Sequence, residues 1–523
     1  MKFIKQSFIT LLVGWLCFSA SSASAQSGGN NNTPDSWSRH DTLNGTKFTM
    51  DGVSVGEGTL KLGLTSRYTG RFSEFSDQAF YQYLRGYLSD FKLGGGTMRV
   101  ALNMRAARDT DGVVTDQAWN YHFAPTVLDS KADYKSGYWD FRLYDANVVL
   151  DNVVNYTKLT AGRFRINYLT EYKVDGAELS VGTDNYNAYA YYGLPVSYYK
   201  YLNTTVVGGG ANLHFFDDMI VLRAEAANFM GGGDDILIDP LYDLIDPVNG
   251  VKTKTPGSVN TMTWKTRADL NFVIGDAANI APYGEFGMVG DAKIFEAGLL
   301  SNITATNTIL NFWVRGQIDN NTDPVSYVIS DYSDSMSSDN EYTQFGANIY
   351  QGIAEIFMVG LGFETRVNNK ESYYDRDYVR VMGNLDFFGV IPDNYLSFTV
   401  DYFDVQAYRQ LAAERKMLLG GQMTQNFSPD LSVWLGARIV NYNYDTHPVD
   451  LARTGMGINV PGEYANRSET NSVYVAYAGF QWNINSMISL TGDCTYEMSD
   501  VIGSVDSAND AVTFAELWFN IAF

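Results

Sequence analysis

Segments in which apolar and polar residues alternate recur along almost the whole chain. Clear examples are residues 99–106, 261–272, 310–318, 396–401 and 488–497. A period of two predicts β-strands with one apolar and one polar face, because successive side chains of a strand point to opposite sides. No helical period is sustained over a comparable stretch. The pattern therefore predicts an all-β protein.

The two faces of these segments differ strongly in polarity. In residues 261–272, one face carries Met262, Trp264, Thr266, Ala268, Leu270 and Phe272, and the other carries Thr261, Thr263, Lys265, Arg267, Asp269 and Asn271. The cleanest segments run to roughly 9–13 residues, the length that a tilted strand needs to cross a bilayer. Because backbone polar groups in lipid need partners within the protein, such strands must close. We predict a transmembrane antiparallel β-barrel with an apolar outside and a polar lumen.

The connections between the segments alternate between short and long. Tight turns are predicted at residues 94–96, 151–155, 216–218, 390–394, 428–430 and 485–486, and long polar connections at 109–136, 231–260, 319–341, 368–377 and 445–471. Bacterial outer-membrane barrels place short turns in the periplasm and long loops outside, and this alternation predicts about 22 strands here. The segments around 178–192 and 281–303 are ambiguous, so the predicted range is roughly 18–22.

The two ends of the chain fit a secreted barrel. Lys2 and Lys5 precede an apolar run and the small residues Ala23-Ser24-Ala25, which predicts a cleaved signal peptide over residues 1–25. Residues 26–57 are rich in Gly, Asn and Ser and are expected to form a flexible periplasmic segment. The barrel would then occupy residues 58–523.

The last segment, residues 511–523, alternates apolar residues with Glu516 and Asn520 and ends at Phe523. We interpret it as the closing strand, paired with residues 488–497 on one side and with the first strand, 59–69, on the other. Leu517, Phe519, Ile521 and Phe523 are expected to face lipid, and Glu516 and Asn520 the lumen.

Composition excludes several classes of function. The 37 basic and 59 acidic residues leave a net charge of −22, which argues against nucleic acid as a partner. Cys494 is the one cysteine outside the predicted signal, and there are four histidines, so no disulfide framework, haem attachment or zinc site is expected. No combination of a serine, a histidine and an orienting third residue is recognisable, so we expect no enzyme activity and no cofactor.

Charged residues cluster most informatively in residues 159–181. Gly162-Arg163 is followed by a predicted loop over residues 167–175 and then by Asp175-Gly176. This arrangement resembles the Gly-Arg…Asp-Gly segment of many porins of Gram-negative bacteria. In those families the segment leads into a loop that folds into the pore and narrows it. The resemblance implies a porin-like outer-membrane channel, and porins of this kind are often homotrimers.

The charges themselves favour a similar constriction. Arg163 and Arg165 share one strand face, further arginines lie on neighbouring strands with lumen parity, and the acids lie in or beside the predicted loop. The candidate pore-lining and constriction residues are Arg99, Arg105, Arg142, Arg163, Arg165, Glu171, Asp175 and Glu178. A basic wall opposite an acidic loop would create a transverse field across a narrow water-filled passage. The alternative is that the arginines pair with acids such as Asp140, Glu225 and Asp269 and only hold the wall together.

These features predict passive diffusion of small hydrophilic solutes or ions across the outer membrane. The barrel would contact outer-membrane lipid and lipopolysaccharide. A second possibility is the sheath of a porin–cytochrome electron conduit, in which a multihaem cytochrome fills the lumen. Because the chain has no haem-attachment motif, it could only be the sheath.

Overall fold

Almost all of the described chain is β-strand. The computed structural model describes residues 53–55, 58–72, 77–109, 139–169, 171–183, 185–196, 204–231, 259–290, 292–319, 341–353, 356–369, 376–406, 414–445, 468–502 and 509–522. The predicted signal peptide, most of residues 26–57 and most of each predicted long connection lie outside these ranges. No helix in the described ranges is long and apolar enough to cross a membrane.

The strands follow one another with short interruptions. They are β1 (Val53–Val55), β2 (Gly58–Phe72), β3 (Asp77–Leu93), β4 (Gly96–Asp109), β5 (Trp139–Asp151), β6 (Thr157–Asn167), β7 (Glu171–Gly182), β8 (Tyr186–Pro195), β9 (Thr204–Phe215), β10 (Ile220–Gly231), β11 (Val259–Leu270), β12 (Phe272–Ile274), β13 (Ala278–Val289), β14 (Ala292–Ile303), β15 (Thr308–Ile318), β16 (Tyr342–Ile353), β17 (Phe357–Asn368), β18 (Tyr378–Phe388), β19 (Asn394–Val405), β20 (Glu414–Ser428), β21 (Leu431–Asp445), β22 (Ser468–Asn485), β23 (Ile488–Ile502) and β24 (Asn509–Ala522). A turn of 3-10 helix, η3 (Thr304–Thr306), connects β14 to β15.

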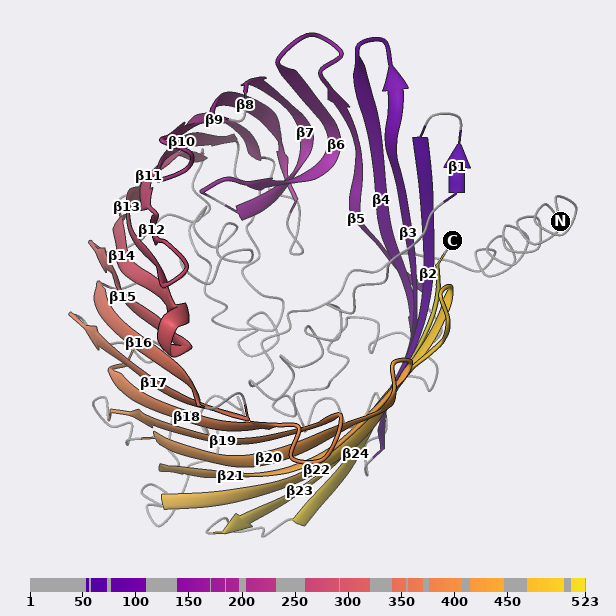
Figure 1. Cartoon of the computed structure of the whole chain (residues 1–523), viewed down its shortest axis with the longest axis vertical. Helices are drawn as coiled ribbons and strands as arrows, with labels where there is room; N and C mark the ends of the chain where they lie inside the picture. Colours follow the sequence, from indigo (N-terminus) through magenta and orange to yellow (C-terminus); the bar gives the residue numbers. More distant parts are fainter. Residues whose placement is uncertain are drawn as a thin grey trace, which may run out of the picture.

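The strands join in chain order into one closed antiparallel barrel (Figure 1). Each strand from β2 onward pairs with the next, except that β11 and β12 both pair with β13. The strand β24 pairs with residues 63–72 of β2 and completes the ring, while the short β1 pairs with residues 58–60 of β2, outside the part that pairs with β24. The wall therefore has 22 strands, and the fold class predicted from the sequence is confirmed.

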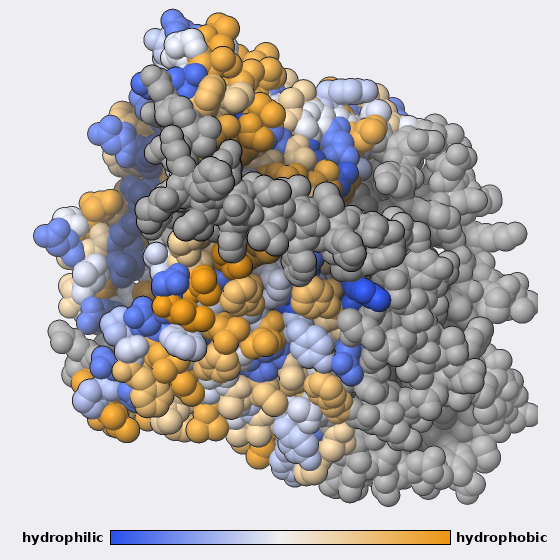
Figure 2. All heavy atoms as spheres, turned by 90° about the vertical axis from the view of Figure 1, so that its right-hand side faces the viewer, coloured by the Kyte–Doolittle hydropathy of each residue, from blue (hydrophilic) through white to orange (hydrophobic). Residues whose placement is uncertain are grey.

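The two faces of the wall carry the polarity that the alternation predicts. Outward side chains with large exposed areas include Leu179, Val207, Leu222, Phe312, Phe398 and Leu435, whereas buried inward ones include Glu225, Lys265, Gln344, Asp386 and Glu516. In β11, Met262 is 54% exposed and Thr263 only 1%. Figure 2 shows hydrophobic residues spread over the described surface on the side where β2 and β24 meet. An apolar exterior around a polar interior is what lipid requires of a barrel.

The first and last wall strands meet in a seam of ten residue pairs, from Gly63 opposite Ala522 to Phe72 opposite Thr513. Here the lumen side is held by Arg67, which forms a salt bridge with Glu516. Its guanidinium carbon lies 4.6 Å from the centre of the Trp518 ring and 5.4 Å from that of Tyr81.

A hydrogen bond from the Thr65 hydroxyl to the Asn520 side-chain oxygen, 2.7 Å long, adds a second contact across the seam. The expected pairing of the chain ends and the lumen position of Glu516 and Asn520 are confirmed. Leu517 and Phe519 are exposed on the opposite face, as predicted.

The salt bridge at the seam gives a first testable prediction. Replacing Glu516 by alanine leaves the guanidinium of Arg67 without its carboxylate in a partly buried site, which should lower the free energy of unfolding by about 1–3 kcal/mol. Urea unfolding of the folded barrel in lipid vesicles measures this change. Arg415→Met is the matched control, because its pair with Asp404 is 3.5 Å long and the arginine is 59% exposed, so removing it should cost less than about 1 kcal/mol. Equal losses in the two variants would contradict the prediction.

Candidate functional site

Part of the wall between β5 and β9 turns into the lumen. The strands β5 and β6 pair over only six residues each, from Ala146 opposite Arg163 to Asp151 opposite Lys158, although both strands continue further. On the other side, pairing of β8 with β9 ends at Gly193 opposite Val206. The strands β6 and β7 stay paired with each other beyond the points where they leave their outer neighbours, as far as Asn167 opposite Glu171. Figure 1 shows their far ends inside the ring, away from β5. We call residues 163–175 the inner hairpin.

Three glycines lie side by side where the inner hairpin leaves the wall. Gly162 is opposite Gly176, and Gly176 is opposite Gly193. Gly162 has a φ of +115°, and a Cβ there would lie 2.1 Å from the carbonyl oxygen of Ala146. A Cβ on Gly176 would lie 2.0 Å from the carbonyl oxygen of Tyr192. The bend therefore requires residues without side chains at this row, which we call the glycine row.

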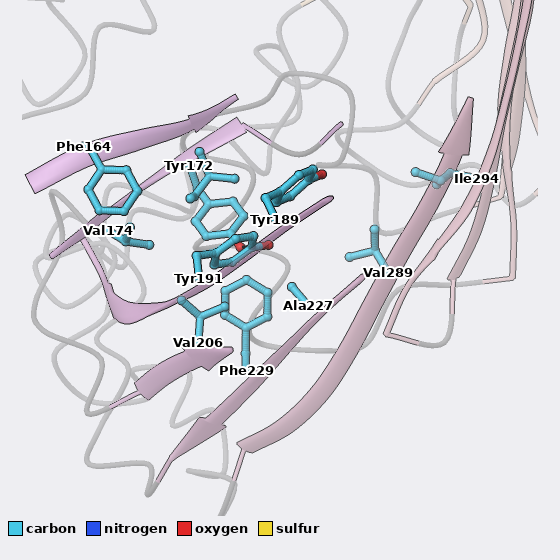
Figure 3. Close-up of a cluster of buried hydrophobic side chains, with 11 residues drawn as sticks. Phe164, Tyr172, Val174, Tyr189, Tyr191, Val206, Ala227, Phe229, Val289 and Ile294 are labelled. Carbon is cyan, nitrogen blue, oxygen red and sulfur yellow. The ribbon is translucent and has the colours of Figure 1, made fainter. Parts of the chain in front are cut away.

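One face of the inner hairpin packs on the inside of the wall. Its apolar residues are Phe164, Ile166, Tyr172 and Val174, and the wall contributes Tyr189, Tyr191, Val206, Ala227, Phe229, Val289 and Ile294. The Tyr172 ring centre is 5.6 Å from that of Phe229 and 6.1 Å from that of Tyr191, and Figure 3 shows these rings gathered together. Burying each large apolar side chain contributes roughly 1.5–3 kcal/mol, so the hairpin is firmly attached.

The opposite face of the inner hairpin is charged. Arg163 donates two hydrogen bonds to the carboxylate of Asp175, 2.7 and 2.6 Å long, and a third of 2.7 Å to the carbonyl oxygen of Leu143. Lys173 lies 3.4 Å from the carboxylate of Asp145 on β5. The side chain of Arg165 is exposed. Because the apolar face lies on the wall, this charged face is turned toward β5 and the interior of the ring.

The tip of the inner hairpin is held by polar contacts to the wall. The ring of Tyr168 stacks on that of Tyr189 with centres 3.6 Å apart, and its hydroxyl donates to Glu178 at 2.7 Å. The backbone N–H of Leu169 donates to Glu225 at 2.9 Å, and Lys265 donates to the carbonyl oxygen of Leu169 at 3.3 Å. Glu225 and Lys265 are 3% and 4% exposed. Directional contacts and apolar packing thus act on the same segment.

The Gly-Arg…Asp-Gly pattern becomes two adjacent cross-strand pairs, Gly162 with Gly176 and Arg163 with Asp175. The loop predicted over residues 167–175 is wrong, because β7 already begins at Glu171, opposite Asn167. The two arms stay in register because each apolar residue on one arm opposes an apolar one on the other, as Phe164 opposes Val174. Glu171 and Asp175 therefore lie on a strand, as Glu178 does.

The other candidate residues occupy separate places. Arg99 lies 3.7 Å from Asp151, and the guanidinium carbon of Arg105 lies 5.3 Å from the centre of the Tyr81 ring. Both are on the lumen face of β4, and Arg142 on β5 is opposite Arg105 in the ladder. Arg163 and Arg165 share a face, as expected, but on the inner hairpin instead of the wall. The structure thus places Arg99, Arg105 and Arg142 together on the wall strands β4 and β5. It places Arg163 and Arg165 together on the hairpin.

Arginines of the wall also pair with acidic residues of the wall, as in the alternative considered from the sequence. Arg223 lies 3.5 Å from Asp269, and Arg267 lies 3.6 Å from Glu285. Glu225, considered as an arginine partner, instead accepts hydrogen bonds at the hairpin tip. Within the described ranges, no group of three or more His, Cys, Asp or Glu residues could hold a metal ion.

Sequence reasoning missed the contacts that hold the hairpin, which are made by Tyr168 at its tip and, on the wall, by Tyr189, Tyr191, Glu225 and Lys265. A signal was present in the polarity of β6. Its outward positions are apolar at Leu159 and Ala161 but charged at Arg163 and Arg165. This inversion begins next to Gly162, so the strand could not have continued in a lipid-facing wall.

No protein-family model and no curated protein matches the sequence. Among solved structures, the chain is similar to the translocation pore of the usher PapC, with 8% identity over 88% of this chain and 99% of that one and a TM-score of 0.43. It is also similar to OccAB3 of Acinetobacter baumannii, with 9% identity, coverage of 90% and 100% and a TM-score of 0.40. A third similar structure is OccD3 (OpdP) of Pseudomonas aeruginosa, with 12% identity over 91% of this chain and 93% of that one and a TM-score of 0.39. These likenesses concern barrel form alone.

The glycine row gives a second prediction. Alanine at Gly162 or at Gly176 would overlap backbone oxygens of the neighbouring strand, and at Gly162 it would also have to adopt a positive φ, so each should lower the free energy of unfolding by about 2 kcal/mol or more. Gly284→Ala on β13 is the control, because a Cβ there meets nothing within 4 Å. Urea unfolding of the three variants is the measurement, and a loss at Gly284 as large as at Gly162 would rule out the proposed crowding.

Proposed function

We propose that this protein is an outer-membrane channel through which small hydrophilic solutes or ions diffuse passively, and that the inner hairpin narrows its passage. The observation that carries the proposal is the hairpin itself, with an apolar face on the wall and a charged face toward the interior. A closed barrel with an apolar exterior suits a bilayer, and bacteria place such barrels in the outer membrane. The predicted signal peptide supports the same location.

The proposed constriction has two sides. The hairpin contributes Arg163, Arg165, Lys173 and Asp175, and the lumen face of β4 contributes Arg99 and Arg105. Solutes would be selected by size and by the field of these charges, which acts strongly across a narrow aqueous gap. Arg142 and Glu171 remain candidates through their backbone positions. For Glu178 we propose that it holds Tyr168 at the hairpin tip instead of lining the passage, because its buried carboxylate accepts the hydrogen bond of the Tyr168 hydroxyl.

The sheath of an electron conduit is the less favoured function. A barrel that encloses a folded multihaem cytochrome needs a wide free lumen along its length. The inner hairpin instead enters the ring and is fixed there by packing and hydrogen bonds. Purified protein in a planar bilayer separates the two functions. Ion conductance by the protein alone supports the channel, and absence of conductance together with co-purified haem supports the sheath.

Charge selection at the hairpin gives a third prediction. Arg165 is exposed on the charged face, so Arg165→Glu should raise the permeability of cations relative to anions while the barrel stays folded. The reversal potential in a salt gradient across a planar bilayer measures this change. Reversal of Arg163 is less suitable, because it would remove the three hydrogen bonds by which Arg163 holds Asp175 and the carbonyl oxygen of Leu143, and so disturb the hairpin itself.

The control is Arg415→Glu, which makes the same change in net charge at an arginine that is also exposed and is not on the hairpin. Its reversal potential should stay close to that of the parent protein. If Arg165→Glu behaves like this control, Arg165 does not line the constriction.

A further inference from the structure

We infer that Glu225 and Lys265 are positioning residues that fix where the inner hairpin stands in the lumen. The two are directly opposite each other on β10 and β11. Together they bind both polar backbone atoms of Leu169, the N–H through Glu225 and the carbonyl oxygen through Lys265. The link from hairpin position to the width of the passage rests on the proposed function.

A second chain of hydrogen bonds ends on the same carboxylate. The hydroxyl of Tyr172 on the β7 arm donates to the hydroxyl of Tyr191 at 2.6 Å, and Tyr191 donates to Glu225 at 2.8 Å. Glu225 thus holds the tip through Leu169 and one arm through Tyr172. Lys265 is itself placed by Glu285, 3.1 Å away on β13. Four wall strands, β8, β10, β11 and β13, therefore contribute to the attachment.

Packing alone would not fix the height and tilt of the hairpin. Apolar contact is not directional, and an apolar face can slide over another with a modest change in buried area. Hydrogen bonds to charged groups have a defined geometry and become stronger where water is excluded. With Glu225 and Lys265 both nearly buried, a displaced Leu169 would lose both of its hydrogen bonds to them at a place from which water is largely excluded. The pair therefore selects one position.

The test measures hairpin position directly by pulsed electron spin resonance. Spin labels are placed on cysteines at Arg165 on the hairpin and at Thr399 on the lumen face of β19, with Cys494 changed to serine. We expect one narrow distance in the parent protein. Glu225→Leu and Lys265→Met should each lose this narrow distance and give a broad distribution. Glu225→Gln, which keeps only one acceptor oxygen, should fall between them and the parent.

Two controls separate positioning from general damage. Glu364→Leu removes another lumen carboxylate, which is hydrogen-bonded to Gln344 on the wall, and should leave the hairpin distance narrow. A second label pair at Thr399 and Thr495, both on wall strands, should be unchanged in every variant.

An unchanged Arg165–Thr399 distance in Glu225→Leu and Lys265→Met would overturn the inference. If Glu225→Leu does not fold, Lys265→Met decides the outcome in the same way. A hairpin that moves while single-channel conductance stays constant would support the positioning role and contradict the proposed constriction, so the two proposals fail separately.

Discussion

Every backbone N–H and C=O group within hydrocarbon must find a partner in the protein, and this constraint determines the architecture. Twenty-two strands meet it by pairing in sequence and closing on themselves. Closure depends on the seam between β2 and β24, where chain ends more than 400 residues apart are in register. Arg67 lies at the centre of that seam, with Glu516 as its ion-pair partner and with Trp518 and Tyr81 as its aromatic neighbours. The ion pair between Arg67 and Glu516 on the lumen side thus stabilises the seam that closes the barrel.

The inner hairpin departs from the wall for an energetic reason. If it stayed in the barrel, Arg163, Arg165 and Lys173 would face lipid, and a cationic side chain near the bilayer midplane costs about 2–4 kcal/mol. Its apolar residues would at the same time face water instead of gaining roughly 1.5–3 kcal/mol each on the wall. Both terms favour the inward position. Before Ala146, β5 is not in register with β6, and there Arg163 and Lys173 donate hydrogen bonds to the carbonyl oxygens of Leu143 and Tyr144.

The barrel could be predicted from the sequence because alternation of polarity is a local property, repeated in every strand. The closing pair and the lumen positions of Glu516 and Asn520 followed from it, and the prediction of about 22 strands, within a range of roughly 18–22, came from the alternation of short and long connections. The site could be predicted only in part. The pairing of Gly162-Arg163 with Asp175-Gly176 lies within one hairpin, so its residues were recognised together. Glu225 and Lys265 are close to Leu169 only in the folded barrel, and no local pattern connects positions so far apart in the chain. The loop over residues 167–175 was predicted wrongly because polarity inversion was not used as a signal for a strand that leaves the wall.

The glycine row has a consequence for how such a barrel can change over evolutionary time. Because Gly162, Gly176 and Gly193 are adjacent on three strands, the bend is a single crease that separates the membrane-spanning ladder on one side from the inner hairpin on the other. Residues added or removed past the crease would alter the hairpin without shifting the register of any wall strand. Under the proposed function, the width of the passage could then change through the length of one hairpin while the register of the membrane-spanning cylinder stays the same.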